Sequence, residues 1–269
     1  MTLILETRNL SRRFGQLTAV KGLSISVAPG EAFGLLGPNG AGKSTAIKML
    51  TTLLPPTGGF ASVGGFDIAR NANDVRRIIG YVPQMLSADG NLTGFENLLL
   101  FSKLYGIRAD VRKRRIDDAL ELMDLTGAAH RLVNTYSGGM LRRVEIAQAM
   151  IHRPRILFLD EPTVGLDPIA RESVWQQVHR LRLDHQMTVV MTTHYMEEAD
   201  QLCGRIAIMH RGDVVCEGSP DELKQSVDHP NATLDDVFVH YAGQTLIDGD
   251  SKGDFRETTR ARRAALRRG

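Results

Sequence analysis

The sequence predicts an α/β fold, in which a largely parallel sheet carries an inserted group of helices. Short apolar runs recur along the chain with turn residues between them, and helical patterns separate several of these runs. The run at residues 156–159 is apolar on both faces, as expected for a strand inside a parallel sheet. Residues 87–150, by contrast, contain helical patterns and no convincing strand. We therefore expect one domain over residues 1–220, with a helical subdomain at about 87–150.

The predicted elements follow one another in a simple order. Apolar runs predict strands at residues 23–27, 32–36, 80–83, 156–159, 188–193 and 205–209. Another strand is expected after a turn at Arg211 and Gly212, ending near residue 218. Ser219 and Pro220 then suit the first positions of a helix. Residues 221–269 are expected to form a C-terminal extension that ends in a basic tail.

Composition and charge are those of an ordinary globular protein. The 269 residues are 42% hydrophobic, and the formal net charge of +2 gives no reason to expect nucleic-acid binding. The excess of positive charge is local, at residues 251–269, and two interpretations stay open: contact with anionic lipid headgroups, or a solvated end. Cys203 and Cys216 lack metal-ligand spacing and suit a reducing cytosol. No window approaches the roughly 20 apolar residues of a membrane-spanning helix, so we expect another chain to supply any spans.

A glycine-rich loop follows the predicted strand at 32–36 and precedes a helix with an apolar face. Glycines allow successive backbone N–H groups to converge on phosphate oxygens, and the helix N-terminus adds its positive dipole end. The lysine is expected to reach the β- and γ-phosphates, the serine to bind Mg²⁺, and the threonine to contact phosphate. This loop predicts nucleoside triphosphate binding, and the lack of an N-K-x-D pattern argues against a GTPase. Its residues are Gly37, Pro38, Asn39, Gly40, Ala41, Gly42, Lys43, Ser44 and Thr45.

Polar side chains follow three other predicted strands. Asp160 and Glu161 end the strand at 156–159, where ligands of open α/β sheets bind. Asp160 suits a Mg²⁺-side role, and Glu161 is placed to polarise a water that attacks the γ-phosphate; the alternative is that both carboxylates cap a helix. His194 ends the strand at 188–193 and is expected to hydrogen-bond the γ-phosphate. Gln84 follows the strand at 80–83, where an amide can contact Mg²⁺ or the attacking water.

A second glycine-rich stretch, Ser137-Gly138-Gly139, precedes a helix whose apolar stripe comprises Met140, Val144, Ala147 and Ile151. The Ser137 hydroxyl and the glycine N–H groups are expected to point outward as an anion-binding nest. One phosphate site does not need two such cradles within one chain.

In this order the motifs resemble the nucleotide-binding domain of an ATP-binding cassette (ABC) transporter, over residues 3 to about 220. The resemblance implies a P-loop NTPase core of the RecA-like type, with an antiparallel β edge and a helical subdomain. It also implies ATP hydrolysis coupled to transport. Phe14 is similar to the aromatic residue that stacks on adenine, although Tyr is usual there. The remaining correspondences assign Gln84 to the Q-loop, Asp160 to the Walker B aspartate, Glu161 to the catalytic base, Asp167 to the D-loop and His194 to the switch histidine.

The signature stretch departs from the usual L-S-G-G-Q, because it begins with Tyr136 and ends with Met140. Together with neighbouring strings, it is similar to the daunorubicin-resistance type of exporter ATPase. That subgroup implies export of a drug, antibiotic, lipid or polysaccharide. The alternative is a soluble ABC-type ATPase in DNA repair or translation, although this chain has one cassette, a short insertion and no metal cysteines.

The family resemblance also implies partners. In a head-to-tail dimer, the nest at Ser137 closes on the γ-phosphate of ATP, which the loop of the other subunit holds with Mg²⁺. The other subunit is most simply a second copy. The cargo path belongs to a separate multi-span permease. The chain is therefore expected in the cytoplasm, peripheral on the inner face of the cell membrane.

Overall fold

A six-stranded sheet forms the centre of the molecule in the computed structural model, which describes residues 3–227 and 230–248. Its strand order is β11-β10-β4-β9-β8-β7, and all neighbours are parallel except the antiparallel β10–β11 pair. Every residue of β4, β8 and β9 is buried, as the continuous apolar runs predict. The strands are β4 (Ala32–Leu36), β7 (Ile79–Val82), β8 (Ile156–Asp160), β9 (Thr188–Thr193), β10 (Arg205–His210) and β11 (Asp213–Gly218).

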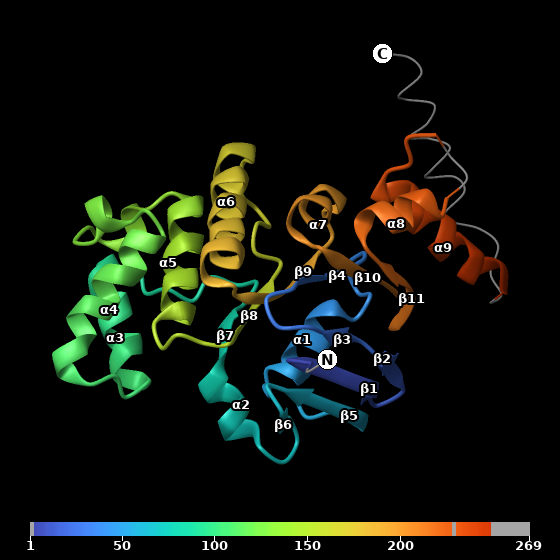
Figure 1. Cartoon of the computed structure of the whole chain (residues 1–269), viewed down its shortest axis with the longest axis horizontal. Coiled ribbons are helices and arrows are strands. Elements are labelled where there is room, and N and C mark those ends of the chain that lie inside the picture. Colours follow the sequence, from blue (N-terminus) through green and yellow to red (C-terminus); the bar gives the residue numbers. More distant parts are fainter. Residues whose placement is uncertain (1–2, 228–229, 249–269) are drawn as a thin grey trace.

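An antiparallel sheet covers one face of this centre, with helix α1 (Lys43–Leu50) between the two sheets (Figure 1). Ile47, Met49 and Leu50 of α1 are fully buried, and they belong to the same apolar cluster as Phe33 and Phe158 of the parallel sheet. Helix α2 (Ala72–Ile78) lies beside this layer and contacts β6 and β7. The antiparallel strands are β1 (Leu5–Phe14), β2 (Leu17–Leu23), β3 (Ser26–Val27), β5 (Gly58–Val63) and β6 (Phe66–Asp67).

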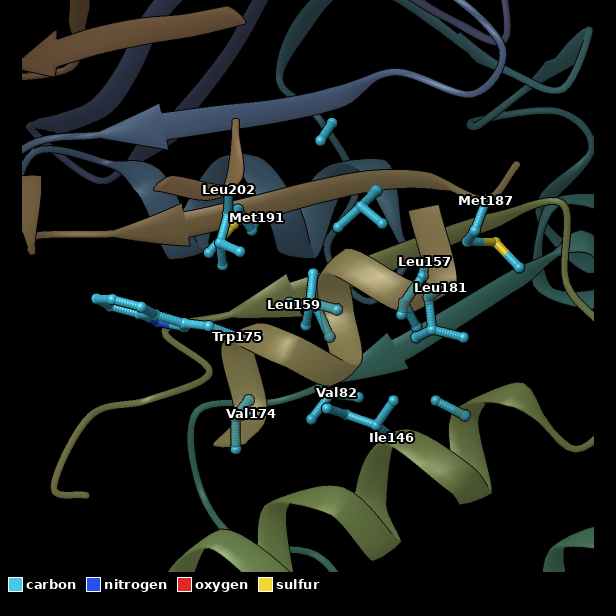
Figure 2. Close-up of a cluster of buried hydrophobic side chains, with 14 of the residues drawn as sticks. Val82, Ile146, Leu157, Leu159, Val174, Trp175, Leu181, Met187, Met191 and Leu202 are labelled. Carbon is cyan, nitrogen blue, oxygen red and sulfur yellow. The ribbon is translucent and has the colours of Figure 1, made fainter. Parts of the chain in front are cut away.

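Helices cover the other face of the parallel sheet (Figure 1). Helix α5 (Gly138–Met150) contacts α3 (Gly94–Leu104), α4 (Ala109–Leu122) and α6 (Pro168–His185). Figure 2 shows the apolar core here, where Leu157, Leu159 and Met191 of the sheet lie near Val174, Trp175 and Leu181 of α6 and Ile146 of α5. Two short 3₁₀ turns, Thr126–Ala128 and Val133–Thr135, lead into α5. Described residues between β7 and β8 thus form helices and loops, with one isolated β-bridge between Thr93 and Leu132.

The C-terminal part of the described chain packs onto the sheet edge at β11. Helix α7 (Met196–Leu202) precedes β10, and α8 (Pro220–Gln225) and α9 (Leu234–Asp248) follow β11. Ser219 begins α8 in a capping box with Glu222, as the sequence predicts for its first positions. The sequence did not predict α9, which contacts α7, α8 and β11. The basic tail at 251–269 lies outside the described residues, and no described helix has the length and hydrophobicity required to cross a membrane.

Candidate functional site

The glycine-rich loop begins at the carboxyl end of β4 and delivers Lys43 as the first residue of α1. Gly37 and Gly42 have φ angles of 152° and 104°. A Cβ at either position would lie 2.3 Å from the Met209 carbonyl oxygen or 2.4 Å from that of Ala19, respectively. Because backbone cannot yield as a side chain can, both positions require glycine. Gly40 also has a positive φ, of 81°, but open space surrounds it.

Lys43 is buried and turned back onto its own loop. Its Nζ donates to the carbonyl oxygens of Gly37 at 2.6 Å and Pro38 at 3.2 Å. It also forms an ion pair with Glu161 Oε1 at 3.0 Å, and both side chains are only 4% exposed. The buried ammonium is therefore fully engaged by three oxygen atoms, because a charge at this depth must be compensated.

Asp160 and Glu161 approach the loop from the end of β8, which is separated from β4 by β9. Ser44 Oγ donates to Asp160 Oδ1 at 2.9 Å, and the Thr192 hydroxyl donates to the same oxygen at 2.6 Å. Thr192 Oγ1 in turn accepts the backbone N–H of Glu161 at 3.0 Å. Thr192 thus holds both acidic residues, and the sequence analysis did not single it out because it resembles any other threonine in a buried strand.

Glu161 has a left-handed backbone conformation, with φ at 52°. Its Oε2 atom lies 2.6 Å from His194 Nδ1, and Oε1 holds Lys43. Because an ionised carboxylate only accepts, His194 is the donor in this contact. The alternative in which both carboxylates cap a helix is not observed, since Asp167 caps α6 by accepting the N–H of Ala170 at 2.9 Å.

Two predicted site residues lie at the margins. Gln84 follows β7, the strand beside β8, and is exposed; its backbone carbonyl accepts from Arg142. Phe14 ends β1 and is 45% exposed, with the Arg12 guanidinium 4.6 Å from the centre of its ring. Cation–π attraction of this kind restrains the orientation of the ring.

Ser137 is the N-cap of α5, and its Oγ accepts the N–H of Met140 at 3.3 Å. Ser137 and Gly138 are exposed, whereas Gly139 is buried. A Cβ at Gly139 would lie 3.1 Å from that of Ala170, so this glycine also permits close packing of α5 on α6. The predicted apolar stripe is confirmed, with Val144, Ala147 and Ile151 buried and Met140 half-buried.

A buried carboxylate that the sequence analysis missed lies behind the site. Glu198 of α7 is fully buried, and its Oε1 accepts from Thr163 Oγ1 at 2.7 Å and from Trp175 Nε1 at 3.0 Å. Burial raises the pKa of Glu198, although these hydrogen bonds act in the opposite direction. Glu198 ties the helix after His194 to the loop after β8 and to α6.

Tyr81 of β7 also has a raised pKa, of about 12, first because it is partly buried and second because the charge of Asp160 is near.

Comparisons with known proteins identify the family to which the chain belongs. The family model described as "ABC transporter" matches residues 20–164. The daunorubicin/doxorubicin resistance ATP-binding protein of Streptomyces peucetius is 46% identical over 84% of this chain and 68% of its own. The linearmycin resistance ATP-binding protein of Bacillus subtilis is 42% identical over 82% of this chain and 70% of its own.

Solved structures give the same family and the same fold. A structure titled as the ATP-binding subunit of an ABC transporter superposes with a TM-score of 0.78 at 29% identity, over 90% of this chain and all of that one. A dimeric ATP-binding cassette in a post-hydrolysis state with ADP and phosphate superposes with a TM-score of 0.70 at 28% identity, over 80% of this chain and 98% of that one. These similarities confirm the predicted P-loop NTPase fold with its antiparallel β edge. The chain belongs to the ABC transporter family, as one of its ATP-binding and ATP-hydrolysing subunits.

Proposed function

We propose that this chain powers export through a separate multi-span permease, by ATP-driven closure and opening of a head-to-tail dimer. The observation that carries the proposal is the convergence of Lys43, Ser44, Asp160, Glu161 and His194 at one edge of the parallel sheet. The names of the relatives concern linearmycin and daunorubicin resistance and, at 40% identity over 92% of this chain, Nod factor export. We therefore propose a drug, antibiotic, lipid or polysaccharide as cargo, rather than a role in DNA repair or translation.

The oxygen atoms between the loop and β8 fit a magnesium ion. Ser44 Oγ and Asp160 Oδ1 lie 2.9 Å apart and are hard oxygen donors of the kind that Mg²⁺ prefers. We assign Ser44, Asp160 and the amide of Gln84 to this ion. When bound, Mg²⁺ neutralises charge on the phosphates during transfer.

The ion pair between Lys43 and Glu161 suggests how ATP prepares the site. The phosphates of ATP compete with Glu161 for Lys43. They also accept hydrogen bonds from the backbone N–H groups of the loop between Gly37 and Thr45. Once Lys43 turns to the phosphates, Oε1 of Glu161 is released and can accept a proton from the attacking water, while His194, which holds Oε2, orients the γ-phosphate. Binding of ATP thereby releases Glu161 to act as the general base.

The second half of each site comes from the signature stretch. Ser137 and Gly138 are exposed at the N-terminus of α5. Gly138 lies against Leu166, the residue before Asp167 at the N-terminus of α6. We propose that Ser137, Gly138 and Gly139 close on the γ-phosphate bound by a second copy, with Asp167 at the same interface. Hydrogen bonds to charged groups contribute about 1.5–3 kcal/mol each, so several together stabilise the closed dimer until hydrolysis.

Phe14 is proposed to stack on adenine. Replacing it with Ala is expected to weaken ATP binding about ten-fold or more, because one base–aromatic stack contributes roughly 1–3 kcal/mol. Displacement of a fluorescent ATP analogue measures the change in Kd. Leu17→Ala is the matched control, since Leu17 pairs with Phe14 across the hairpin and is 67% exposed. Equal losses in both variants would contradict a specific role for the ring, whereas Phe14→Tyr should bind normally.

Exposed apolar side chains next to Gln84 in the chain are proposed to contact the permease. Met85 is 83% exposed and Leu86 59%. Leu86→Asp is therefore expected to reduce copurification with the permease at least several-fold while the ATPase activity of the isolated subunit is unchanged. Leu53→Asp, at a residue 60% exposed, serves as the control.

Purification of the tagged chain from detergent-solubilised membranes tests the proposed function as a whole. A multi-span membrane protein should copurify, and vesicles with both chains should transport cargo only when ATP is hydrolysed. Recovery of ribosomal RNA or a DNA-repair complex, with no membrane protein, would overturn the proposal.

A further inference from the structure

One face of α5 carries three buried polar side chains that the nucleotide site does not use. Arg142, Glu145 and Gln148 are spaced three residues apart and therefore share a face of the helix. Each is only 2% exposed. The helix thus has a polar face as well as its apolar stripe, and the polar face is turned toward the segment that follows β7.

Arg142 and Glu145 hold the backbone around Gln84. The Arg142 guanidinium donates to the carbonyl oxygen of Pro83 at 2.8 Å and to that of Gln84 at 3.0 Å. Glu145 Oε2 accepts from Arg142 at 3.0 Å. Glu145 Oε1 accepts the backbone N–H of Ser87 and, at 3.1 Å, the Ser87 hydroxyl. One buried ion pair therefore fixes the chain on both sides of Met85 and Leu86.

Gln148 extends this arrangement by one step. Its Nε2 donates to Asn97 Oδ1 at 3.1 Å. Asn97 in turn accepts the N–H of Asp89 at 2.9 Å and donates to the carbonyl oxygen of Asp89 at 2.9 Å. Residues 83–89 are thus held to α5 at two direct points and at a third through Asn97 of α3. We name Arg142, Glu145 and Gln148 the α5 polar ladder.

Stability alone does not account for a buried ion pair at this position. Removing two charges from water is costly, and well-packed apolar residues of similar volume are often as stabilising or more so. A buried ionic group that is hydrogen-bonded to backbone atoms instead restricts that backbone to one geometry. Arg142 and Glu145 bond two carbonyl groups and one N–H group of a loop, where apolar residues could only pack against it.

We propose that the α5 polar ladder is a set of positioning residues that joins residues 83–89 rigidly to helix α5, so that the two move together. Ser137 begins the helix whose second turn carries Arg142, so a displacement of residues 83–89 moves the Ser137 end with it. The ladder thereby sets where Gln84 lies relative to Asp160 when the dimer closes. This inference rests on the proposed function, because it requires Gln84 and Ser137 to act in ATP turnover.

The first test replaces the ion pair with apolar residues in the full-length protein. Arg142→Met/Glu145→Met is expected to fold with a similar melting temperature and to bind a fluorescent ATP analogue with Kd within about two-fold of wild type. Its kcat should fall about ten-fold or more, because small misplacements of catalytic groups have effects of this size. Arg143→Met is the matched control, since Arg143 on the same helix bonds the carbonyl oxygen of Met123 instead. Its kcat should remain that of wild type.

A double-mutant cycle with Gln84→Ala separates positioning from a general structural effect. If the ladder acts through Gln84, the Met pair should cause little further loss of kcat once Gln84 has been removed. Independent, multiplicative losses would overturn the inference. Wild-type turnover in Gln84→Ala would overturn the role proposed for Gln84 and the ladder's action through it, whereas unchanged turnover in the Met pair with an impaired Gln84→Ala would overturn the ladder alone. Should the Met pair fail to fold, Glu145→Gln, which keeps the side-chain shape, replaces it in the cycle and should also reduce kcat non-additively.

Discussion

Glu161→Gln is expected to reduce ATP turnover by about 10²–10⁴-fold while ATP binding persists. A positioned general base contributes rate factors of this size, and an amide cannot accept the proton from water. The substitution also removes the carboxylate that holds Lys43 at 3.0 Å, so Lys43 turns to the phosphates more readily. The variant should therefore accumulate as an ATP-bound dimer. Phosphate release and light scattering after size exclusion, both with Mg²⁺ and ATP, measure the two effects.

The matched control for this prediction is Glu172→Gln. Glu172 is an exposed glutamate of α6 that pairs only with Gln176 among the contacts described, at 3.3 Å. The Glu172→Gln substitution should leave ATP turnover and the lifetime of the dimer unchanged. A Glu161→Gln protein that remains monomeric with ATP, under conditions in which wild type dimerises, would show that Glu161 does not control reopening.

Gly138→Asp is expected to reduce turnover about 100-fold or more without weakening ATP binding by the monomer. Gly138 is exposed at the start of α5, and in the proposed dimer its position faces the γ-phosphate of the other subunit. Juxtaposed like charges cost several kcal/mol, and each 1.36 kcal/mol corresponds to a factor of ten in rate. Turnover as a function of protein concentration, together with ATP affinity of the dilute monomer, measures the separation of the two effects.

Two control variants separate the effect of the added charge from the effect of a larger side chain at position 138. Gly138→Ala adds only a Cβ, which would lie 2.9 Å from a terminal methyl group of Leu166, a side chain that can move. It should lose far less activity than Gly138→Asp. Gly127→Asp adds the same charge at an exposed position with open space around it, and it should remain active. If Gly138→Asp instead abolished ATP binding by the monomer, this result would contradict the proposal that a second copy completes the ATP site.

Local sequence patterns predicted the elements that matter most for nucleotide binding. Apolar runs identified β4, β8 and β9, because a strand buried on both faces tolerates almost no polar side chain. The glycine spacing identified the loop before Lys43, since Gly37 and Gly42 occupy positions where any Cβ would overlap a backbone oxygen. The helix α9 was missed, because much of its stability comes from contacts with α7, α8 and β11 rather than from its own pattern.

The sequence by itself determined the family, the nucleotide loop and the identity of the acidic and histidine residues, because each depends on short-range spacing. Only the tertiary structure decided what those residues contact. It paired Glu161 with both Lys43 and His194, placed Thr192 so that it holds Asp160, and buried Glu198 behind them. It also turned the polar face of α5 onto the backbone around Gln84. These contacts join residues far apart in the chain, and burial changes the electrostatic cost of each charged group, so no local pattern encodes them.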